Sequence, residues 1–303
     1  MKKYSLVAVA LLLPLTAQAQ TIGYSFLRTA IGARPAGMAA SFVAVSNDMH
    51  SIFHNPAGIG DLEQRSAGFG YLNHVLDIQN FSGVYVAPVK RGSYGFALQY
   101  TNYGDFTRTN QFGEEQGSFG AYNMVAYLSY SRKQTERLLL GGNAKYIRSS
   151  LADFSSDALA LDLGVIYHSD LFSNVTFGFG IYNLGAVVSA FDQTKERLPL
   201  NFQVGISKTL THLPLMYSLA LVKYAEEDFE FRAGGEFTLA QGFFARLGYD
   251  TIGSEQKIGT DGDRFAGFSV GLGLAHRRYR FDYGLSSFGE VGSLNRLNIS
   301  MEF

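Results

Sequence analysis

Two histidines four residues apart are the first candidates for a chemical role in this chain. His50 and His54 would share one face of a helix, which is the spacing of paired zinc ligands in metalloproteases. Those enzymes also need a glutamate directly after the first histidine, whereas Ser51 stands at that position here. The pair lacks the general base of that chemistry, and we expect no metal there.

The acidic sequence Asp261-Gly262-Asp263 is a second candidate for metal binding. It resembles the start of a calcium loop, but the further oxygen ligands and the terminal glutamate of such a loop are missing. The sequence predicts a turn between two strands at this position.

Hydrolytic chemistry would require a serine within reach of a histidine that a third group orients. The six histidines fall before the strands described below, in an outer loop or near strand ends: His50, His54, His74, His168, His212 and His276. None lies in the middle of a strand beside a serine. We therefore expect a protein that is not an enzyme and that uses no cofactor.

Composition and charge exclude further classes of site. The chain contains no cysteine, which removes disulfides and thiolate metal sites from consideration. Its formal net charge of −1 becomes more negative once a leader containing Lys2 and Lys3 is removed, so nucleic-acid binding is not expected. The 34 glycines, 25 phenylalanines and 18 tyrosines favour strands and tight turns over helices.

The first 19 residues read as a secretory signal peptide. Lys2 and Lys3 form its basic start, Leu6 to Leu15 its apolar stretch, and Ala17-Gln18-Ala19 its cleavage site. After Ala19 no run of about 18 uncharged apolar residues occurs, so we expect an exported protein without a helical membrane anchor.

From Ser66 onward, apolar and polar residues alternate with a period of two. Phe268, Val270, Leu272 and Leu274, for example, alternate with serine and glycine. Such segments predict an all-β fold, a transmembrane antiparallel β-barrel of about 14 strands over residues 66–303 with one face toward lipid and the other toward the lumen. The strands are expected near 66–73, 79–88, 92–103, 120–132, 137–149, 157–168, 173–184, 199–208, 215–224, 227–237, 241–251, 264–275, 277–287 and 294–303.

The connections and the carboxy-terminal strand support a barrel in the cell outer membrane. Short connections alternate with longer ones near 104–119, 185–198, 252–263 and 288–293, as expected of periplasmic turns and outer loops. The last strand ends in an aromatic residue, which resembles the signal read by the outer-membrane insertion machinery; its apolar positions are Leu297, Ile299, Met301 and Phe303. A β-sandwich is the alternative, but aromatic residues near strand ends favour the girdles of a membrane barrel.

Charged residues at predicted lumen positions admit two interpretations. They are Lys145, Asp162, Glu230, Arg232, Glu236, Arg246, Asp250, Arg280 and Asp282. They could line a substrate path, but we favour a salt-bridged interior that plugs the barrel.

Residues 20–65 lack the alternation and are rich in small side chains, so we expect this segment to lie inside the barrel. Its motif comprises Gly37, Asn47, Asp48, Asn55, Pro56, Ala57 and Gly58. This motif resembles the amino-terminal hatch of FadL-like barrels, and most closely that of the PorV/PorQ family. The resemblance continues in segments such as Tyr103-Gly104-Asp105-Phe106 and Gly141-Gly142-Asn143. The start Tyr24-Ser25-Phe26-Leu27 and the segment Tyr103-Gly104-Asp105-Phe106 resemble the PorQ branch more than the PorV branch. The sequence departs from the family pattern at Ala39-Ala40, where Gly-Gly is usual.

That resemblance implies a role in the type IX secretion system, in which PorQ-like barrels hold a surface-exposed partner and PorV-like barrels shuttle secreted cargo. The leading hypothesis is therefore an interaction protein in contact with outer-membrane lipid and with type IX components or cargo. Its candidate contact residues lie in the outer loops: Phe106, Arg108, Phe112, Phe191 and Lys257. The alternative is a FadL-like transporter of hydrophobic compounds. An apolar, continuous pocket bordering residues 42–58 would favour transport, and a lumen filled with paired charges would favour docking.

Overall fold

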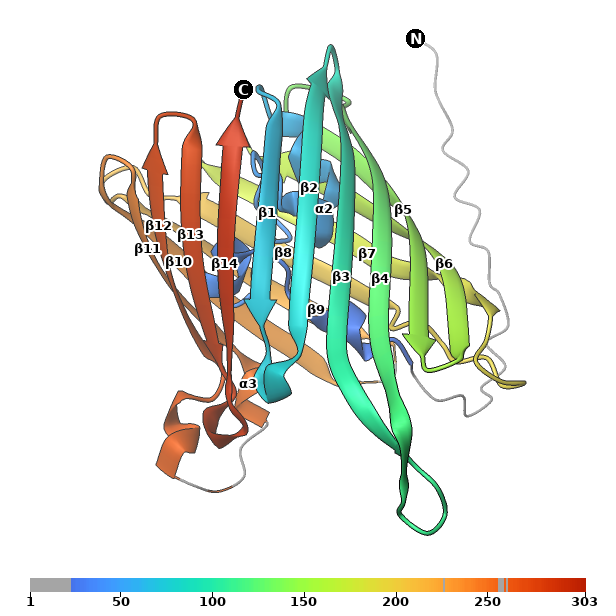
Figure 1. Ribbon diagram of the computed structural model, residues 1–303. Coiled ribbons are helices and arrows are strands. Elements are labelled where there is room, and N and C mark those ends of the chain that lie inside the picture. Colours follow the sequence, from blue (N-terminus) through green and yellow to red (C-terminus); the bar gives the residue numbers. More distant parts are fainter. Residues whose placement is uncertain (1–22, 226, 256–258, 260) are drawn as a thin grey trace.

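A single antiparallel sheet that closes on itself dominates the computed structural model, which describes residues 23–225, 227–255, 259 and 261–303 (Figure 1). Each strand pairs with its neighbours in sequence, and the first strand pairs with the last, Ser66 standing opposite Glu302. The expected 14-stranded barrel is confirmed. The strands are β1 (Ser66–Asn73), β2 (Gln79–Val89), β3 (Gly92–Thr109), β4 (Glu115–Lys133), β5 (Leu138–Leu151), β6 (Phe154–His168), β7 (Val175–Ser189), β8 (Asn201–Thr209), β9 (Leu215–Tyr224), β10 (Phe229–Ala240), β11 (Phe243–Asp250), β12 (Phe268–His276), β13 (Tyr279–Ser287) and β14 (Ser293–Glu302).

The two ends of the barrel differ in the length of their connections. At the end that holds the carboxy terminus the turns are short, for example residues 90–91 and 277–278. The opposite end carries η3 (Val75–Asp77), α3 (Thr251–Glu255), η4 (Asp261–Phe265) and η5 (Gly289–Val291). Short turns mark the periplasmic end of bacterial barrels, so the longer connections face the cell exterior.

The loops expected near 104–119 and 185–198 are the main errors in the predicted strand positions. β3 continues to Thr109 and β4 begins at Glu115, so the two strands form a hairpin that extends past the other strands (Figure 1). β7 continues to Ser189. Beyond the membrane both faces of a strand meet water, so the alternation of apolar and polar residues ends while backbone pairing continues. The period-two signal therefore stops before the strand does.

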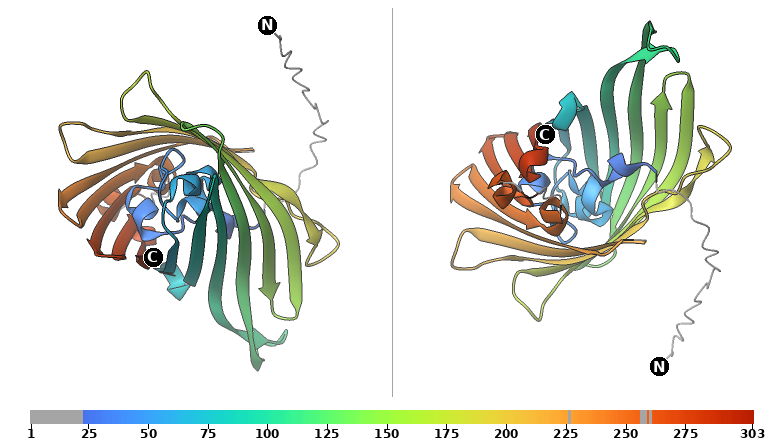
Figure 2. Two further views of the ribbon diagram at one scale, coloured as in Figure 1. Left: turned by 90° about the horizontal axis from the view of Figure 1, so that it is seen from above. Right: turned by 90° about the horizontal axis from the view of Figure 1, so that it is seen from below.

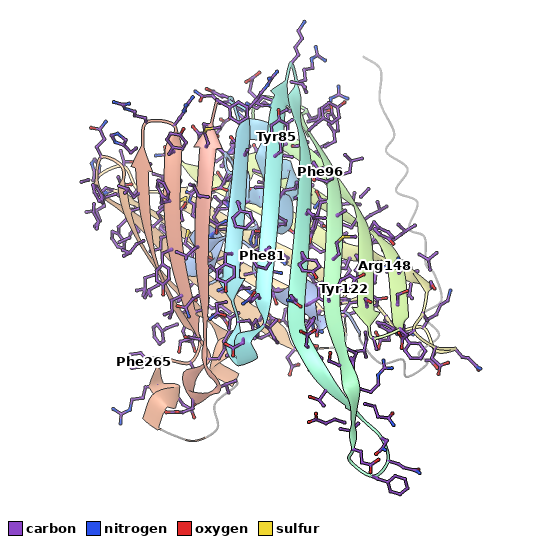
Figure 3. The ribbon with its side chains drawn as sticks, viewed as in Figure 1. Phe81, Tyr85, Phe96, Tyr122, Arg148 and Phe265 are labelled. Carbon is purple, nitrogen blue, oxygen red and sulfur yellow. The ribbon has the colours of Figure 1, made fainter. Side chains whose placement is uncertain are left out.

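Side chains on the strands alternate between the outer face and the lumen. On β6, Leu161 and Leu163 are each 49% exposed, whereas Asp162 between them is 2% exposed. Figure 3 shows Phe81, Tyr85 and Phe96 projecting from the outer face of β2 and β3. The exposed side chains form an apolar outer surface of the kind that contacts lipid.

This facing gives a first prediction. Leu272 on β12 is 62% exposed, whereas Ser269 is 1% exposed and faces the lumen. We expect Leu272→Arg to lower the free energy of unfolding by about 2–4 kcal/mol if the residue lies near the midplane of the bilayer. Ser269→Arg should destabilise through crowding of the lumen instead. Urea unfolding in bilayers of two thicknesses separates the variants, because only the stability loss of Leu272→Arg should change with bilayer thickness. If both losses change equally, Leu272 and Ser269 do not face lipid and lumen as assigned.

The segment before β1 lies inside the ring of strands, as the end-on views of Figure 2 show. We call its residues 23–65 the hatch. The hatch contains η1 (Ser25–Arg28), α1 (Ala33–Gly37), α2 (Ser51–His54) and η2 (Pro56–Asp61). None of the helices in the described ranges is long and apolar enough to cross a membrane. Residues 1–19, predicted to be a signal peptide, lie outside the described residues.

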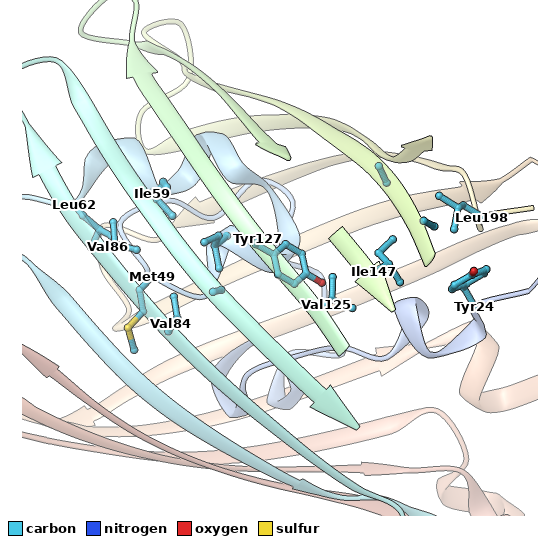
Figure 4. Close-up of a cluster of buried hydrophobic side chains, with 14 of the residues drawn as sticks. Tyr24, Met49, Ile59, Leu62, Val84, Val86, Val125, Tyr127, Ile147 and Leu198 are labelled. Carbon is cyan, nitrogen blue, oxygen red and sulfur yellow. The ribbon is translucent and has the colours of Figure 1, made fainter. Parts of the chain in front are cut away.

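One side of the hatch packs on the wall through apolar side chains (Figure 4). Tyr24, Met49, Ile52, Ile59 and Leu62 of the hatch belong to one cluster with buried residues of β2 to β7 and with Leu198. The contributions from the strands are Val84, Val86, Ala97, Val125, Tyr127, Ile147, Ala158, Ala160 and Val187. Burial of this apolar area stabilises the hatch in the barrel.

The rest of the hatch lies against glycines of the wall. Four pairs of glycines stand directly opposite each other on neighbouring strands; we call them the glycine seat: Gly141 and Gly164, Gly178 and Gly205, Gly234 and Gly248, and Gly271 and Gly284. A Cβ atom at any of them except Gly271 would come closer than 3.0 Å to another atom, in most cases an atom of the hatch. The hatch backbone thus approaches the wall more closely than any side chain would permit.

Candidate functional site

Asn55 is the motif residue that joins the hatch to the wall most directly. Its Nδ2 donates to the carbonyl of Val43 at 2.6 Å and to the strand carbonyls of Val165 on β6 and Phe179 on β7 at 3.2 and 3.4 Å. Its Oδ1 accepts from the amide of Ala57 at 3.1 Å, which caps η2, whose first residue is Pro56. The motif thus sets the position of η2 against β6 and β7.

Backbone geometry and close contacts explain the residue types at other positions of the hatch. Asn47 has a φ of 58°, and its amide donates to the carbonyl of Gly58 at 3.0 Å. A Cβ at Gly37 would lie 3.0 Å from the Cα of Gly271. Ala39 and Ala40 have φ values of 52° and 54°, a left-handed conformation that glycine adopts more readily. These contacts make the motif part of the packing of the hatch.

A buried ion-pair network links α1 to the wall. The guanidinium of Arg34 contacts Asp48 Oδ2 and Glu236 Oε1 on β10, both at 2.7 Å. Arg246 on β11 contacts Glu236 Oε2 at 2.6 Å and Asp282 Oδ1 on β13 at 2.7 Å. With the pair of Lys145 and Asp162 at 2.6 Å and that of Arg232 and Glu230 at 2.8 Å, the network confirms the predicted salt-bridged interior.

His50 and His54 bind separate partners. His50 Nδ1 lies 3.0 Å from Asp48 Oδ1, while His54 Nε2 donates to the carbonyl of Ile31 at 2.8 Å. Burial alone would raise the pKa of Asp48, but His50 and Arg34 hold it well below its usual value; burial lowers the pKa of His54 to about 4. Among the described residues no group of three or more His, Cys, Asp and Glu side chains could hold a metal ion. Asp261-Gly262-Asp263 falls in η4.

A cavity of about 340 Å³ lies between the hatch and the outer end of the barrel. Its floor includes Ala36, Ala39, Phe53 and His54 of the hatch. Its walls come from inward residues of strands on both sides of the lumen, among them Gln99, Lys145, Asp162, Tyr182, Gln203, Tyr224, Glu230, Arg232, Asp250, Ser286, Leu294 and Arg296. Only Phe53 and His54 come from residues 42–58, so the cavity is not the continuous apolar pocket that would favour hydrophobic transport.

Residues 24–31, which we call the strap, form another wall of this cavity and are fixed to three parts of the barrel. Arg28 makes a two-point contact with Glu227 at 2.6 and 2.9 Å and lies over the ring of Tyr224, 4.3 Å from its centroid. Tyr24 shares a 2.6 Å hydrogen bond with Ser156, and Arg296 donates to the carbonyl of Ala30 at 3.0 Å. The strap and the rest of the hatch therefore line the cavity together.

Polar groups line the cavity on several strands, among them Lys145 and Asp162. We call the group where the strap meets β9, β10, β11 and β14 the polar side. Tyr224, Glu230, Arg232, Asp250 and Arg296 line it there. Glu230 Oε2 accepts from Arg232 at 2.8 Å, while Glu230 Oε1 is buried without a hydrogen-bond partner among the described residues. The sequence analysis identified three of these residues as lumen charges but missed Tyr224, Arg296 and Arg28. The sequence pattern does predict a lumen position for Arg296, because it alternates with Leu297. No pattern in the sequence indicates a role for Arg28.

The predicted contact residues of the outer loops do not form one surface. Phe106 and Arg108 lie on β3 and Phe112 at the tip of the same hairpin, where it is 78% exposed. Phe106 also lines a hollow of about 300 Å³ beside the strap together with Phe191 and Tyr103. Lys257 lies outside the described residues. The structure thus brings Phe106 and Phe191 together.

The residues of the proposed assembly signal share the outer face of β14. Leu297 and Ile299 are exposed, and the chain ends with Phe303, whose amide donates to the carbonyl of Arg65 at 2.9 Å. Phe303 also lies beside the ring of Tyr85, with 6.3 Å between centroids.

Deletion of Phe303 is expected to reduce the amount of heat-modifiable barrel in outer-membrane fractions while export to the periplasm continues. The reason is loss of the terminal aromatic residue of the alternating strand. Unfolded and folded bands on unheated gels measure the effect, with Glu302→Gln as a control that keeps the aromatic residue. An unchanged yield of barrel would count against the signal.

Solved structures of FadL-like channels share this fold over nearly their whole length. A FadL homologue of Pseudomonas aeruginosa has a TM-score of 0.58 and 11% identity, covering 94% of this chain and 100% of its own. The toluene transporter TodX of P. putida has a TM-score of 0.61 and 11% identity, with coverages of 90% and 98%. The monoaromatic hydrocarbon channel CymD has a TM-score of 0.58 and 11% identity, with coverages of 90% and 96%.

Neither the scan against protein-family models nor the search of curated proteins finds a match. The structural similarity at this low identity concerns the fold. It agrees with the apolar outer face, the closed 14-stranded sheet and the internal hatch. The chain is an outer-membrane β-barrel with a FadL-like fold.

Proposed function

We propose that this barrel is an outer-membrane channel that binds a small molecule in the lumen cavity and passes it around the hatch toward the periplasm. The observation that carries the proposal is the cavity itself, which the strap and the rest of the hatch line within a barrel of this fold. The structural similarity to TodX, a toluene transporter, and to CymD, a monoaromatic hydrocarbon channel, supports transport of small molecules.

The cavity lining refines the kind of molecule expected. Leu27, Ile31, Phe53 and Leu294 supply apolar surface, but charged side chains stand beside them. A pure hydrocarbon would displace water from around these ion pairs without offering them a hydrogen bond, which is unfavourable. The cargo of this channel is therefore a small molecule that has polar groups as well as an apolar part.

Blocking the cavity tests this function. Ser286 lines the cavity on β13, and Leu285 beside it points to the opposite face of the same strand. We expect Ser286→Trp to reduce barrel-dependent uptake several-fold, whereas Leu285→Trp leaves it near the wild-type rate. The measurement is initial uptake of radiolabelled toluene, benzoate, L-leucine and glucose by cells that express each variant at equal level. If no probe enters faster with the barrel than without it, the proposed function is wrong.

A docking role in type IX secretion is the second candidate, supported by the resemblance of the hatch motif and by the β3–β4 hairpin. The hairpin extends beyond the other strands (Figure 1). Phe106 stacks on Phe119 with 5.5 Å between ring centroids and 23° between planes. Arg108 lies 5.8 Å from the ring of Phe119 and 3.1 Å from Asp153. The paired charges of the lumen also fit a barrel that holds a partner at the cell surface.

The two candidates differ in what the hairpin does. Replacing residues 106–117 by a short Gly/Ser turn should leave the barrel folded and, under the docking role, release the surface partner and impair secretion of type IX cargo. Under the transport role the same variant secretes normally. Cargo secretion by cells whose barrel is correctly inserted decides between them, with Phe112→Ser as a control that keeps the length of the hairpin. Normal secretion after this change, and after equivalent changes in residues 190–200 and 251–267, would exclude docking.

A further inference from the structure

The polar side of the lumen cavity presents charges of both signs within one small space. Glu230 and Asp250 carry the carboxylates, and Arg232 and Arg296 the guanidinium groups. Arg28 enters the same side from the strap, with its guanidinium over Tyr224. Charges of both signs beside apolar side chains such as Leu27, Ile31 and Phe53 would match a ligand that is itself dipolar.

Two atoms on this side are buried without a hydrogen-bond partner among the described residues. One is Glu230 Oε1, whose residue is 3% exposed, and the other is Nε of Arg28. The other oxygen of Glu230 and the two terminal nitrogens of Arg28 are already engaged, by Arg232 and by Glu227. A carboxylate oxygen needs a donor and a guanidinium N–H needs an acceptor, and burial makes both costly to leave unpaired.

We propose, resting on the proposed channel function, that the ligand of this cavity is a small zwitterion with an apolar side chain, of the α-amino acid class. Its ammonium group donates to Glu230 Oε1, and its carboxylate accepts from Arg28 and Arg296. Its side chain lies toward Leu27, Ile31 and Phe53. A cavity of about 340 Å³ accommodates a molecule of this size.

A set of four probes that share an apolar body isolates the two charges. L-leucine carries both, isopentylamine only the ammonium, 4-methylpentanoate only the carboxylate, and toluene neither. We expect the purified barrel in detergent to bind L-leucine at least tenfold more tightly than each of the other three, measured by equilibrium dialysis with radiolabelled probes.

One substitution should then exchange the preference. Glu230→Gln removes the negative charge that repels a carboxylate and accepts an ammonium. It should weaken L-leucine binding at least tenfold and strengthen 4-methylpentanoate binding relative to wild type. A merely unfolded variant would lose both probes, so the opposite changes identify the role of Glu230. Glu290→Gln, at an exposed glutamate of the same end of the barrel, should change neither.

Wild-type binding decides the inference even if Glu230→Gln fails to fold. Equal or tighter binding of toluene than of L-leucine overturns the zwitterion proposal, while the uptake experiment with Ser286→Trp still decides whether the barrel is a channel. Binding of no probe also overturns it and leaves the cavity filled with water. Selective binding of L-leucine supports it.

Discussion

Glu236→Ala is expected to release α1 of the hatch from the barrel wall and to lower the free energy of unfolding by about 3–5 kcal/mol. Glu236 contacts Arg34 at 2.7 Å and Arg246 at 2.6 Å, and Arg280 lies 3.5 Å from the same carboxylate. Removing the anion leaves these cations in a buried site with less compensation. The loss is large because a buried charge without its partner keeps its full desolvation penalty.

Limited proteolysis measures release of the hatch, and urea unfolding measures the loss of stability. In the Glu236→Ala variant we expect cleavage next to Arg28 or Arg34 at protease concentrations that leave the wild type intact. Glu302→Ala, at an exposed position on the periplasmic side of β14, serves as the matched control. If both variants resist protease as the wild type does, the ion pairs do not hold the hatch.

Gly178→Ala is expected to displace the hatch through a different cause, the loss of close approach. A Cβ at this position of β7 would collide with the backbone carbonyl of Val43, which cannot move as the end of a side chain can. Overpacking of this kind costs typically about 1–3 kcal/mol, and a backbone obstacle places the cost at the upper end.

Gly83→Ala gives a control in the same kind of strand. A Cβ at Gly83 on β2 meets nothing within 4 Å, so the substitution should change the unfolding free energy little. Chemical denaturation of both variants in the same detergent measures the difference. Equal stability of Gly178→Ala and Gly83→Ala would show that the glycine seat does not position the hatch.

Strand number and facing could be predicted because membrane strands must alternate. Val270 and Leu272 lie toward lipid, and Gly271 lies toward the lumen. This alternation can be read directly from the amino-acid sequence. The outer half of the β3–β4 hairpin could not be predicted, since Thr107 and Arg108 meet water on both faces and carry no alternation. The FadL-like hatch was recognised from its motif, but the motif does not distinguish docking from transport.

The cavity could be predicted only in part, because it depends on barrel closure. The positions of Glu230, Arg232 and Asp250 on inward faces follow from period-two alternation. That Arg296 of the last strand and Arg28 of the strap join them follows only from the pairing of β14 with β1 and from the path of the hatch. Distances between side chains on strands far apart in sequence have no local signal.

The contacts of Asn298 couple the position of the hatch to closure of the barrel. Its Oδ1 accepts from the amide of Ala33 at 2.6 Å, and its Nδ2 donates to His50 Nε2 at 3.2 Å and to the carbonyl of Phe69 on β1 at 3.4 Å. One side chain of the last strand thus joins two parts of the hatch to the first strand, and the free edges of β1 and β14 disappear only when these strands meet. These hydrogen bonds are complete only when the hatch lies inside the barrel and β1 is paired with β14, so placement of the hatch and closure of the wall stabilise each other.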